Sequence, residues 1–298
     1  AYEKKTAKAL KQAARIGIAQ GLFESGAKEE AVALYYDIYQ TDPDDLTAVK
    51  SYAGVLLGVD RPDESVEILE RFTPKPEEEF DYYAIYGAAN FNAKRFEPAM
   101  KAYTLLIEMR PDLTEFQYSL ATCYRKLKQW DKAKGLYTNL QSQFPDDGEP
   151  WKQMGLLEYE RESFDQAVEE LTTAISKFKS TNNDKGITDS QNLIDEVKWI
   201  GAKSLMSEGK FDIACPQLNA LRLKSDMLRY GFDTAICYRE SKQFDKSDPL
   251  FTELIQQNPD NPNLFIAFNE GLLQQKDTSK TKTLLEDFVR NNGYTSPK

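Results

Sequence analysis

Enzyme chemistry depends on a few side-chain types, and this sequence is poor in them. Its 298 residues include no histidine. That excludes nucleophiles activated by a histidine base, HExxH zinc sites and any other histidine ligand. The 48 acidic residues often stand side by side, as at Glu169 and Glu170. Hydrolysis of a sugar bond needs two carboxylates facing each other across a cleft, so we interpret these pairs as solvated helix faces.

Motifs that bind nucleotides or metals are also missing from the sequence. It has no G-x-G-x-x-G, no G-x-x-x-x-G-K-[ST] and no D-x-[DN]-x-[DN]-G loop. Cys123, Cys215 and Cys237 form no C-x-x-C and lie in apolar, helix-like contexts. We therefore interpret all three cysteines as buried small hydrophobic residues. The sequence predicts a protein that is not an enzyme, with no cofactor and no metal site.

Charge and hydropathy exclude two classes of partner. The net charge is −10, from 38 basic and 48 acidic residues. Nucleic acids and anionic membranes both reward clustered Lys and Arg, so neither is expected as the main partner. No apolar run approaches the length of a membrane-spanning helix, so direct membrane insertion is not expected. If Ala1 follows a removed leader, we expect the periplasm or cell envelope; otherwise we expect the cytoplasm.

The elements that must position any site recur along the chain. A small residue followed four positions later by a large one, and then by a proline, repeats at intervals of 34 residues or a multiple of it. Examples are Ala31, Tyr35 and Pro43; Ala99, Tyr103 and Pro111; and Ala133, Tyr137 and Pro145. A second pattern, a large residue followed by a small one, precedes each of these: Ile18-Ala19, Tyr52-Ala53, Tyr86-Gly87, Leu120-Ala121 and Met154-Gly155. Both patterns match one face of a helix, so each period predicts two amphipathic helices, helix A and helix B.

These residues resemble the tetratricopeptide repeat, whose pattern combines a large residue, Leu-Gly, Tyr, Ala, an aromatic residue and Pro. The resemblance implies an all-α, right-handed superhelical solenoid of about eight helix pairs. Small residues would stand where helix A crosses helix B, because a larger side chain would push the axes apart. The predicted organisation is an N-terminal helical extension (1–11), five repeats (12–178), a polar insertion that could act as a hinge (179–191), three repeats (192–290) and a tail (291–298).

In repeats of this kind, one face of each helix A lines the concave side of the superhelix. The register assigns aromatic and basic residues to that face. The candidate anchors are Phe91, Tyr118, Tyr159, Trp199 and Phe232. The candidate residues that would orient an acidic or C-terminal group are Lys50, Arg125, Lys152, Lys203 and Arg239. Lys50 is followed four residues later by Gly54, so the Lys-Asn clamp that some members use for carboxyl-terminal peptides is not reproduced.

The predicted function is therefore a scaffold or adaptor that holds a peptide or helix of a partner protein in this groove. Two alternatives stay open: a homo-oligomeric scaffold that uses the same groove, and a sensor of a small ligand or signalling peptide. The groove could also hold the chain's own N-terminal segment. The partner's identity, the oligomeric state and the pathway are not encoded in any pattern found.

Overall fold

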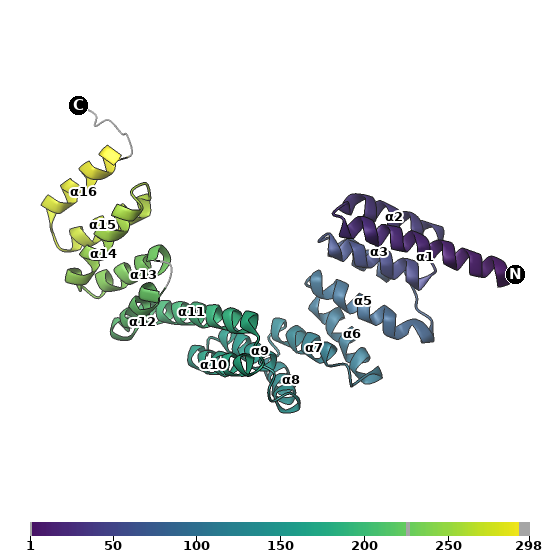
Figure 1. The fold of residues 1–298 in the computed structure, drawn as a ribbon. Helices are drawn as coiled ribbons and strands as arrows, with labels where there is room; N and C mark the ends of the chain where they lie inside the picture. Colours follow the sequence, from purple (N-terminus) through teal and green to yellow (C-terminus); the bar gives the residue numbers. More distant parts are fainter. Residues whose placement is uncertain (1, 225–226, 292–298) are drawn as a thin grey trace. The chain divides into compact units, whose positions relative to one another are not determined.

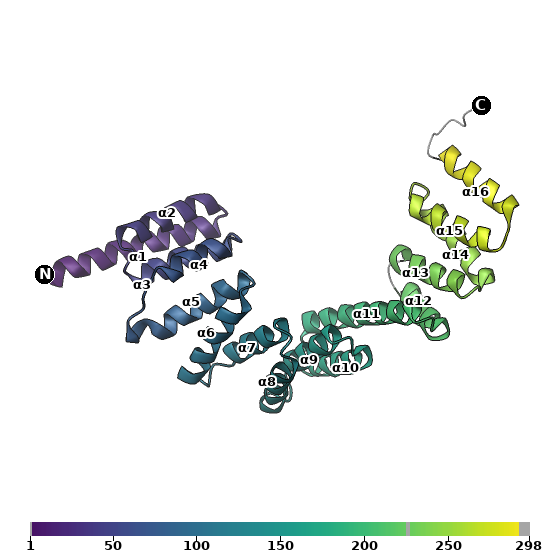
Figure 2. The ribbon, with the colours of Figure 1, turned by 180° about the vertical axis from the view of Figure 1, so that it is seen from behind.

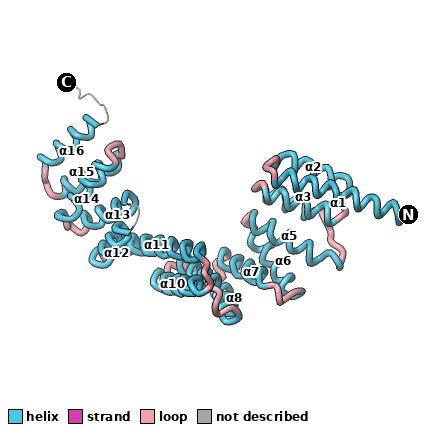
Figure 3. The backbone as a smooth tube through the Cα atoms, in the orientation of Figure 1, coloured by secondary structure: helices cyan, strands magenta, loops and turns pink. Residues whose placement is uncertain are grey.

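Antiparallel helix pairs follow one another along the chain, joined by short loops (Figure 1; Figure 2; Figure 3). The structure is a computed structural model that describes residues 2–224 and 227–291. Within these residues there are sixteen α-helices, one short 3-10 helix and no strand. The contacts divide the chain into two compact units, which we call the N-terminal block (1–143) and the C-terminal block (144–298).

The N-terminal block contains four helix pairs, each formed by a helix A and the helix B that follows it. The A helices are α1 (Tyr2–Glu24), α3 (Leu46–Gly58), α5 (Glu79–Asn92) and α7 (Thr114–Lys126). The B helices are α2 (Lys28–Thr41), α4 (Pro62–Glu70), α6 (Phe96–Met109) and α8 (Trp130–Gln143). The 3-10 helix η1 (Pro76–Glu78) leads into α5.

The C-terminal block contains four more pairs. Its A helices are α9 (Glu149–Glu160), α11 (Asp184–Ser207), α13 (Met227–Glu240) and α15 (Pro262–Gln274). Its B helices are α10 (Phe164–Ser180), α12 (Phe211–Lys224), α14 (Phe244–Gln257) and α16 (Thr278–Asn291). The predicted all-α fold of eight helix pairs is confirmed.

The small residues of the repeat pattern lie where helices cross, as predicted. On the B helices the repeated alanines are fully buried: Ala31, Ala99, Ala133, Ala167 and Ala214. A side-chain atom added at Gly155 would meet the Leu171 Cγ at 2.6 Å. These residues let helix A and helix B approach closely enough to exclude water from between them. Tyr137, which follows Ala133, is fully buried and fills the space beside the crossing.

All eight turns from helix A to helix B end in the same backbone conformation. One residue in each turn has a positive φ, between +57° and +91°. In chain order these residues are Gly26, Asp60, Lys94, Lys128, Glu162, Gly209, Lys242 and Lys276. The next residue donates its N–H to a carbonyl five positions back, as Gln129 does to Tyr124 at 2.8 Å. This Schellman closure satisfies the carbonyls at the end of helix A and reverses the chain into helix B.

The polar stretch 179–191, expected as an insertion between repeats, is built differently. It forms the end of α10, a short turn and the first two turns of α11. These consecutive helices have 17 and 24 residues, whereas every other described α-helix except α1 has 14 or fewer. The turn reuses the geometry of the A-to-B turns, because Asn182 has a φ of +55° and Asn183 donates its N–H to the Phe178 carbonyl at 2.8 Å. The division between the compact units lies at Gln143 and Phe144, away from this stretch.

One buried aromatic ring of α10 packs against the start of α9 and the start of α11. Phe178 is almost fully buried, and its ring would lie 2.7 Å from a side-chain atom added at Gly148 or at Gly186. The two glycines therefore leave the space that the ring occupies. The Asn183 side chain caps α11 by accepting the Gly186 N–H at 2.9 Å. From this close packing and the capped helix start, we propose that α10 and α11 are fixed relative to each other at this turn.

The ends of the chain also differ from the predicted boundaries. Residues 2–11 are the first turns of α1, which continues without interruption to Glu24. The helix that was expected as an extension is therefore continuous with the first helix A. Of the predicted tail, residues 292–298 lie outside the described part of the chain.

Candidate partner-binding surface on the A helices

In the N-terminal block, the predicted contact residues lie on α3, α5 and α7. The Lys50 ammonium on α3 forms an ion pair with Asp81 on α5 at 2.9 Å, and both side chains stay partly exposed. Phe91 is half-buried, with its ring edge-on to Phe96 at 5.7 Å between centroids. Each of these side chains therefore already contacts the neighbouring helix.

The two candidates on α7 differ in how accessible they are. Tyr118 is half-buried, whereas Arg125, seven residues later, is only 7% exposed. Arg125 also takes part in interactions within the protein. The sequence analysis expected its guanidinium to orient a partner group. The structure instead assigns Arg125 to the interior, because the register identifies a helix face without showing how deeply its residues are buried.

In the C-terminal block, Lys152 and Tyr159 lie at opposite ends of α9. The Lys152 ammonium pairs with Glu149 at 2.6 Å and lies 5.8 Å from the centroid of the Phe178 ring. Its side chain is mostly covered. Burial raises the pKa of the Tyr159 phenol, the negative charge of Glu196 raises it further, and Arg229 opposes this rise. Tyr159 is therefore electrostatically coupled to the next two A helices.

Six residues on α11 and α13 form a compact group of rings and charges, which we call the Trp199 cluster. Its members are Glu196, Trp199 and Lys203 on α11 and Arg229, Tyr230 and Asp233 on α13. The indole N–H of Trp199 donates to the Asp233 carboxylate at 2.6 Å. The Arg229 guanidinium lies 3.9 Å from the centroid of the Trp199 ring, and the Lys203 ammonium lies 4.6 Å from it. Such contacts are cation–π interactions, and they hold the ring in one orientation.

The charges within the Trp199 cluster are paired unequally. Arg229 pairs with Glu196 at 2.7 Å. Lys203 lies 3.7 Å from the Asp233 carboxylate, which also accepts the Trp199 N–H. The Lys203 side chain is 46% exposed, so its ion pair is weak and solvated. Lys203 is the cation of the cluster that can most easily turn toward an incoming carboxylate.

Arg239, another predicted contact residue, is a structural clamp. Its guanidinium donates to the Ala267 carbonyl at 2.8 Å and to Glu270 on α15 at 2.6 Å. It also forms two hydrogen bonds with Glu240. Its side chain is only 9% exposed. The positive charge expected to orient a partner group therefore holds α13 to α15.

The last helix A carries exposed apolar side chains that the sequence analysis did not assign to this face. Ile266 is 58% exposed and Leu273 is 56% exposed, both on α15. They stand 34 residues after Phe232 and Arg239, at the same register positions. Phe232 is half-buried, with its ring edge-on to Phe251. Extending the register by one period would have found both residues.

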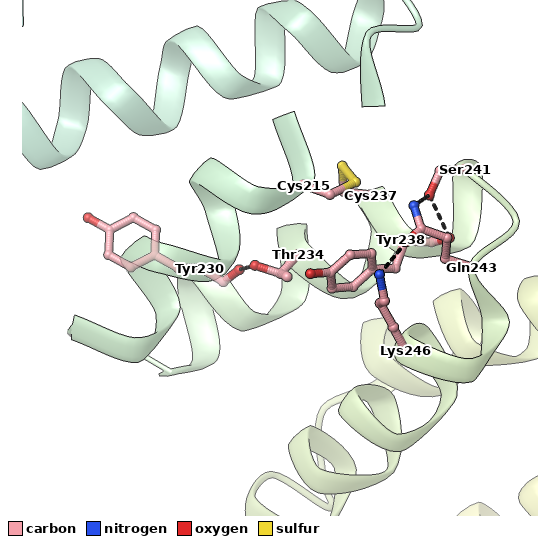
Figure 4. The surroundings of a disulfide bond; sticks show 8 residues. All are labelled: Cys215, Tyr230, Thr234, Cys237, Tyr238, Ser241, Gln243 and Lys246. Atoms are coloured by element: carbon pink, nitrogen blue, oxygen red, sulfur yellow. Dashed lines mark hydrogen bonds between the residues drawn. A yellow bond between two sulfur atoms is a disulfide. The ribbon is translucent and has the colours of Figure 1, made fainter. Parts of the chain in front are cut away.

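The cysteines differ from their interpretation as three buried hydrophobic residues. Cys215 on α12 and Cys237 on α13 form a disulfide, with 5.5 Å between their Cα atoms (Figure 4). Cys123 is buried and free, and burial raises the pKa of its thiol to about 12. Both cysteines of the disulfide are buried, on helices that pack side by side. A separation of 22 residues along the chain gives no sign of this pairing until the two helices are placed together.

The residues around the disulfide fix the start of the next helix B (Figure 4). The Lys246 ammonium lies 5.2 Å from the centroid of the Tyr238 ring and donates to the Gln243 side chain at 2.6 Å. Gln243 in turn donates to the Ser241 hydroxyl at 3.0 Å. The cross-link thus joins α12 to α13, the helix that bears half of the Trp199 cluster.

In residues 2–224 and 227–291, no group of three or more Cys, Asp or Glu side chains is arranged to hold a metal ion. No helix in the part of the chain that the structure describes has the length and apolar character needed to cross a membrane.

Comparison with known proteins concerns the fold. The family model "Tetratricopeptide repeat" matches residues 115–147. No curated protein matches the sequence. The solved structure of Naa15/Naa10 bound to HypK-THB is 15% identical with a TM-score of 0.52, covering 96% of this chain and 43% of that one.

Two solved MamA structures match about half of the chain. The MamA RS-1 ArsTM double mutant is 16% identical with a TM-score of 0.51, covering 58% of this chain and 98% of that one. MamA 41-end from Desulfovibrio magneticus RS-1 is 16% identical with a TM-score of 0.50, covering 57% and 96%. Identities this low establish a shared fold and nothing about ligands. The 34-residue register, the single matched repeat and the shared fold agree, and the chain folds as an α-solenoid of tetratricopeptide-type helix pairs.

Proposed function

We propose that the protein is a non-enzymatic interaction scaffold whose C-terminal block binds a peptide or helix of a partner protein. The binding surface is the face of α9, α11, α13 and α15 that carries Tyr159, the Trp199 cluster, Phe232, Ile266 and Leu273. Stacked repeats expose long continuous surfaces of this kind, and tetratricopeptide repeats are units of protein-interaction scaffolds. Among the proteins of similar fold, Naa15/Naa10 was solved bound to HypK-THB, which is consistent with such a role.

The observation that carries the proposal is the exposure of Ile266 and Leu273. Two large apolar side chains more than half exposed lie on one helix face, and a contiguous apolar patch built around such residues usually marks an interaction site. Fully burying such a side chain contributes about 1.5–3 kcal/mol, so the pair would supply roughly 3–6 kcal/mol before the costs of association. The half-buried rings of Tyr159 and Phe232 add contact area on the same face. A micromolar complex is a realistic expectation.

The Trp199 cluster suggests which chemistry the partner offers. Its cations and carboxylates balance, so it attracts neither sign of charge strongly as it stands. Lys203 is the exception, because its ion pair is long and its side chain is 46% exposed. A partner carboxylate could replace Asp233 beside Lys203 and leave the hydrogen bond from Trp199 in place. The expected ligand is an amphipathic segment with apolar residues for α15 and an acidic group for Lys203.

The test is selection of peptides against the full-length chain from a displayed random library. The affinity of each selected peptide is then measured by fluorescence polarisation. Ile266→Asp and Leu273→Asp should each weaken binding at least tenfold, because an apolar contact becomes a buried charge. The double variant Trp199→Ala with Tyr159→Ala should also weaken it. The matched control is Leu223→Asp, which makes the same kind of change at an exposed leucine of α12.

The outcomes separate the proposal from its alternatives. Selected peptides that bind all the variants with the wild-type affinity would exclude this face as the binding surface. Failure to select any peptide would exclude short linear ligands for the chain. Lys203→Glu adds a check on polarity, since it should weaken acidic peptides and leave neutral ones unchanged.

A further inference from the structure

The outer side of α12 carries apolar side chains where a helix at a surface normally carries polar ones. Ile213 is 46% exposed and Leu223 is 71% exposed, with Pro216 and Ala220 exposed between them. Their spacing of three and four residues puts all four on one face of the helix. The opposite face is the buried one, formed by Ala214, Cys215, Leu218 and Leu221. We call the exposed row the α12 stripe.

A helix that is apolar on both sides is expected to be covered on both sides. The inner side of α12 packs against α11 and α13, whereas its outer side meets none of the described residues closely enough to be buried. A groove of about 740 Å³ runs beside the stripe, between α10, α11 and α12. Ala220 belongs to both, and Phe164, Val168 and Leu205 add apolar lining. The stripe and groove form one continuous surface on the C-terminal block.

The order of residues along the α12 stripe is self-complementary. Ile213 and Leu223 lie five residues on either side of Leu218, and Pro216 and Ala220 lie two residues on either side. When two identical helices pack antiparallel about a two-fold axis, residues equally distant from the axis face each other. An axis at Leu218 would set Ile213 against Leu223 of a second copy, and Pro216 against Ala220.

The charged residues at the two ends of the α12 stripe follow the same two-fold symmetry. Asp212 and Lys224 lie six residues on either side of Leu218 and have opposite signs. Both are exposed, and the Lys224 side chain remains 48% exposed although it pairs with Asp195 at 2.6 Å. The same antiparallel arrangement would bring Asp212 beside Lys224 of the second copy, twice in each dimer. Like charges would meet if the helices were parallel and in register, so the pattern favours the antiparallel arrangement.

We infer that a second copy of this chain covers the α12 stripe, forming a two-fold symmetric dimer through antiparallel α12 helices. One helix and the edge of a groove form a contact smaller than the roughly 800 Å² per partner of a standard stable interface. The dimer is therefore weak and depends on concentration. This surface is separate from the face of the A helices, so the dimer leaves the proposed peptide site open and does not rest on it.

Sedimentation velocity of the full-length chain, from low to several hundred micromolar, tests the dimer. The wild type should shift from monomer to dimer across this range. Leu223→Asp should raise the dissociation constant at least tenfold, because two added charges would face Ile213 of the other copy. Asp212→Lys should weaken the dimer most at low ionic strength, where unscreened lysines oppose each other. Far-UV circular dichroism checks that each variant stays folded, as expected for exposed positions.

The matched control is Leu273→Asp, which adds the same charge at an exposed leucine on α15 and should leave the dimer unchanged. A wild-type chain that remains monomeric at the highest concentration would overturn the inference. It would mean that a partner other than a second copy covers the α12 stripe. A dimer that survives both Leu223→Asp and Asp212→Lys would also overturn it. A dimer that Leu273→Asp dissociates would move the interface to the A helices and refute the α12 stripe.

Discussion

Single atoms decide whether two helices can cross at the distance seen in each repeat. At Gly155, an added side-chain atom would meet the Leu171 Cγ at 2.6 Å and the Ala167 carbonyl oxygen at 3.2 Å. At Gly54, also in the interior of a helix A, the same atom would meet nothing within 4 Å. The two glycines differ in packing and share helical context, so they form a matched pair.

Replacing each of these glycines by alanine should have opposite effects on stability. Gly155→Ala gains roughly 1 kcal/mol of helix propensity but overpacks the crossing, which typically costs about 1–3 kcal/mol. Gly54→Ala should stabilise the protein by roughly 0.5–1 kcal/mol, because only the propensity gain remains. Urea unfolding followed by circular dichroism measures both. Equal shifts of the two midpoints would refute the assignment of Gly155 to a tight crossing.

The burial of Cys123 can be tested through the pKa of its thiol. Burial raises the pKa of its thiol to about 12, whereas an unfolded cysteine has a pKa of about 8.5. Between these two values the unfolded chain carries the reactive thiolate and the folded chain keeps the proton. Labelling of native protein should therefore stay slow from pH 7 to pH 10. In denaturant, one thiol per chain should react, with a rate that rises through about pH 8.5.

The outcome of the labelling separates burial from other causes of slow reaction. Native labelling as fast as that in denaturant would mean that Cys123 is accessible. Three reactive thiols in denaturant without reductant would mean that Cys215 and Cys237 are not joined. After reduction in denaturant, three thiols are expected, which provides the internal standard.

At the scale of the elements, the structure of α10 and α11 leads to a prediction opposite to the hinge expected from the sequence. A hinge at 179–191 would exchange its amide hydrogens quickly. The structure gives most of these residues helical hydrogen bonds and packs Phe178 between Gly148 and Gly186. Amides from 186 to 191 should therefore exchange as slowly as those in the middle of α9 and α13, as measured by hydrogen exchange with mass spectrometry.

A control variant tests the cause of this protection. Asn183→Ala removes the cap that accepts the Gly186 N–H, at a cost of about 1 kcal/mol to the helix start. Exchange in the first turn of α11 should then increase, while α9 stays unchanged. Rapid exchange across 179–191 in the wild type would restore the hinge interpretation.

The sequence was sufficient to predict the elements wherever a small residue marks a crossing. Ala99, Ala133 and Ala167 recur every 34 residues because each crossing has the same geometry. The pattern failed at 179–191, where two long helices bury only a narrow side and the composition is polar. The sequence does contain Phe178 and, eight residues later, Gly186. Their contact can be recognised only once α10 and α11 have been placed side by side.

The site was less predictable than the fold for the same reason. Tyr159, Trp199 and Lys203 lie on neighbouring A helices, whereas Arg239, which the register placed on the concave face, contacts the next repeat. Whether such a residue meets solvent or the next helix depends on side-chain lengths and on Glu270, which lies 31 residues away from Arg239. Arg125 and Arg239 were therefore assigned to a partner when the protein itself uses them.

At the scale of the whole molecule, the disulfide makes the two blocks unequal. Cys215 and Cys237 join α12 to α13 within the C-terminal block, and the N-terminal block contains no counterpart among its described residues. A cross-link that closes a loop of this length stabilises a fold by roughly 3 kcal/mol. Repeat proteins need not unfold in one step, so the loss on reduction should be local.

Reduction should therefore destabilise the C-terminal block by about 3 kcal/mol and leave the N-terminal block unchanged. Hydrogen exchange with and without a phosphine reductant resolves the two blocks in one experiment. The double variant Cys215→Ala with Cys237→Ala is the control, because it should resemble the reduced protein and ignore the reductant. Equal losses in both blocks would show that the blocks unfold together.

The eight positive-φ turns offer an independent route to a more stable molecule. Only Gly26 and Gly209 are glycines, and the other six turns hold Asp, Lys or Glu in a conformation that costs such residues roughly 1–2 kcal/mol. Glycine at Lys94, Lys128 or Lys242 should recover about 0.5–1 kcal/mol each after its own entropy cost. Turns in separate repeats are far enough apart for their effects to add. Since none of the three lies on the A-helix face or the α12 stripe, thermal resistance could be engineered without altering either surface.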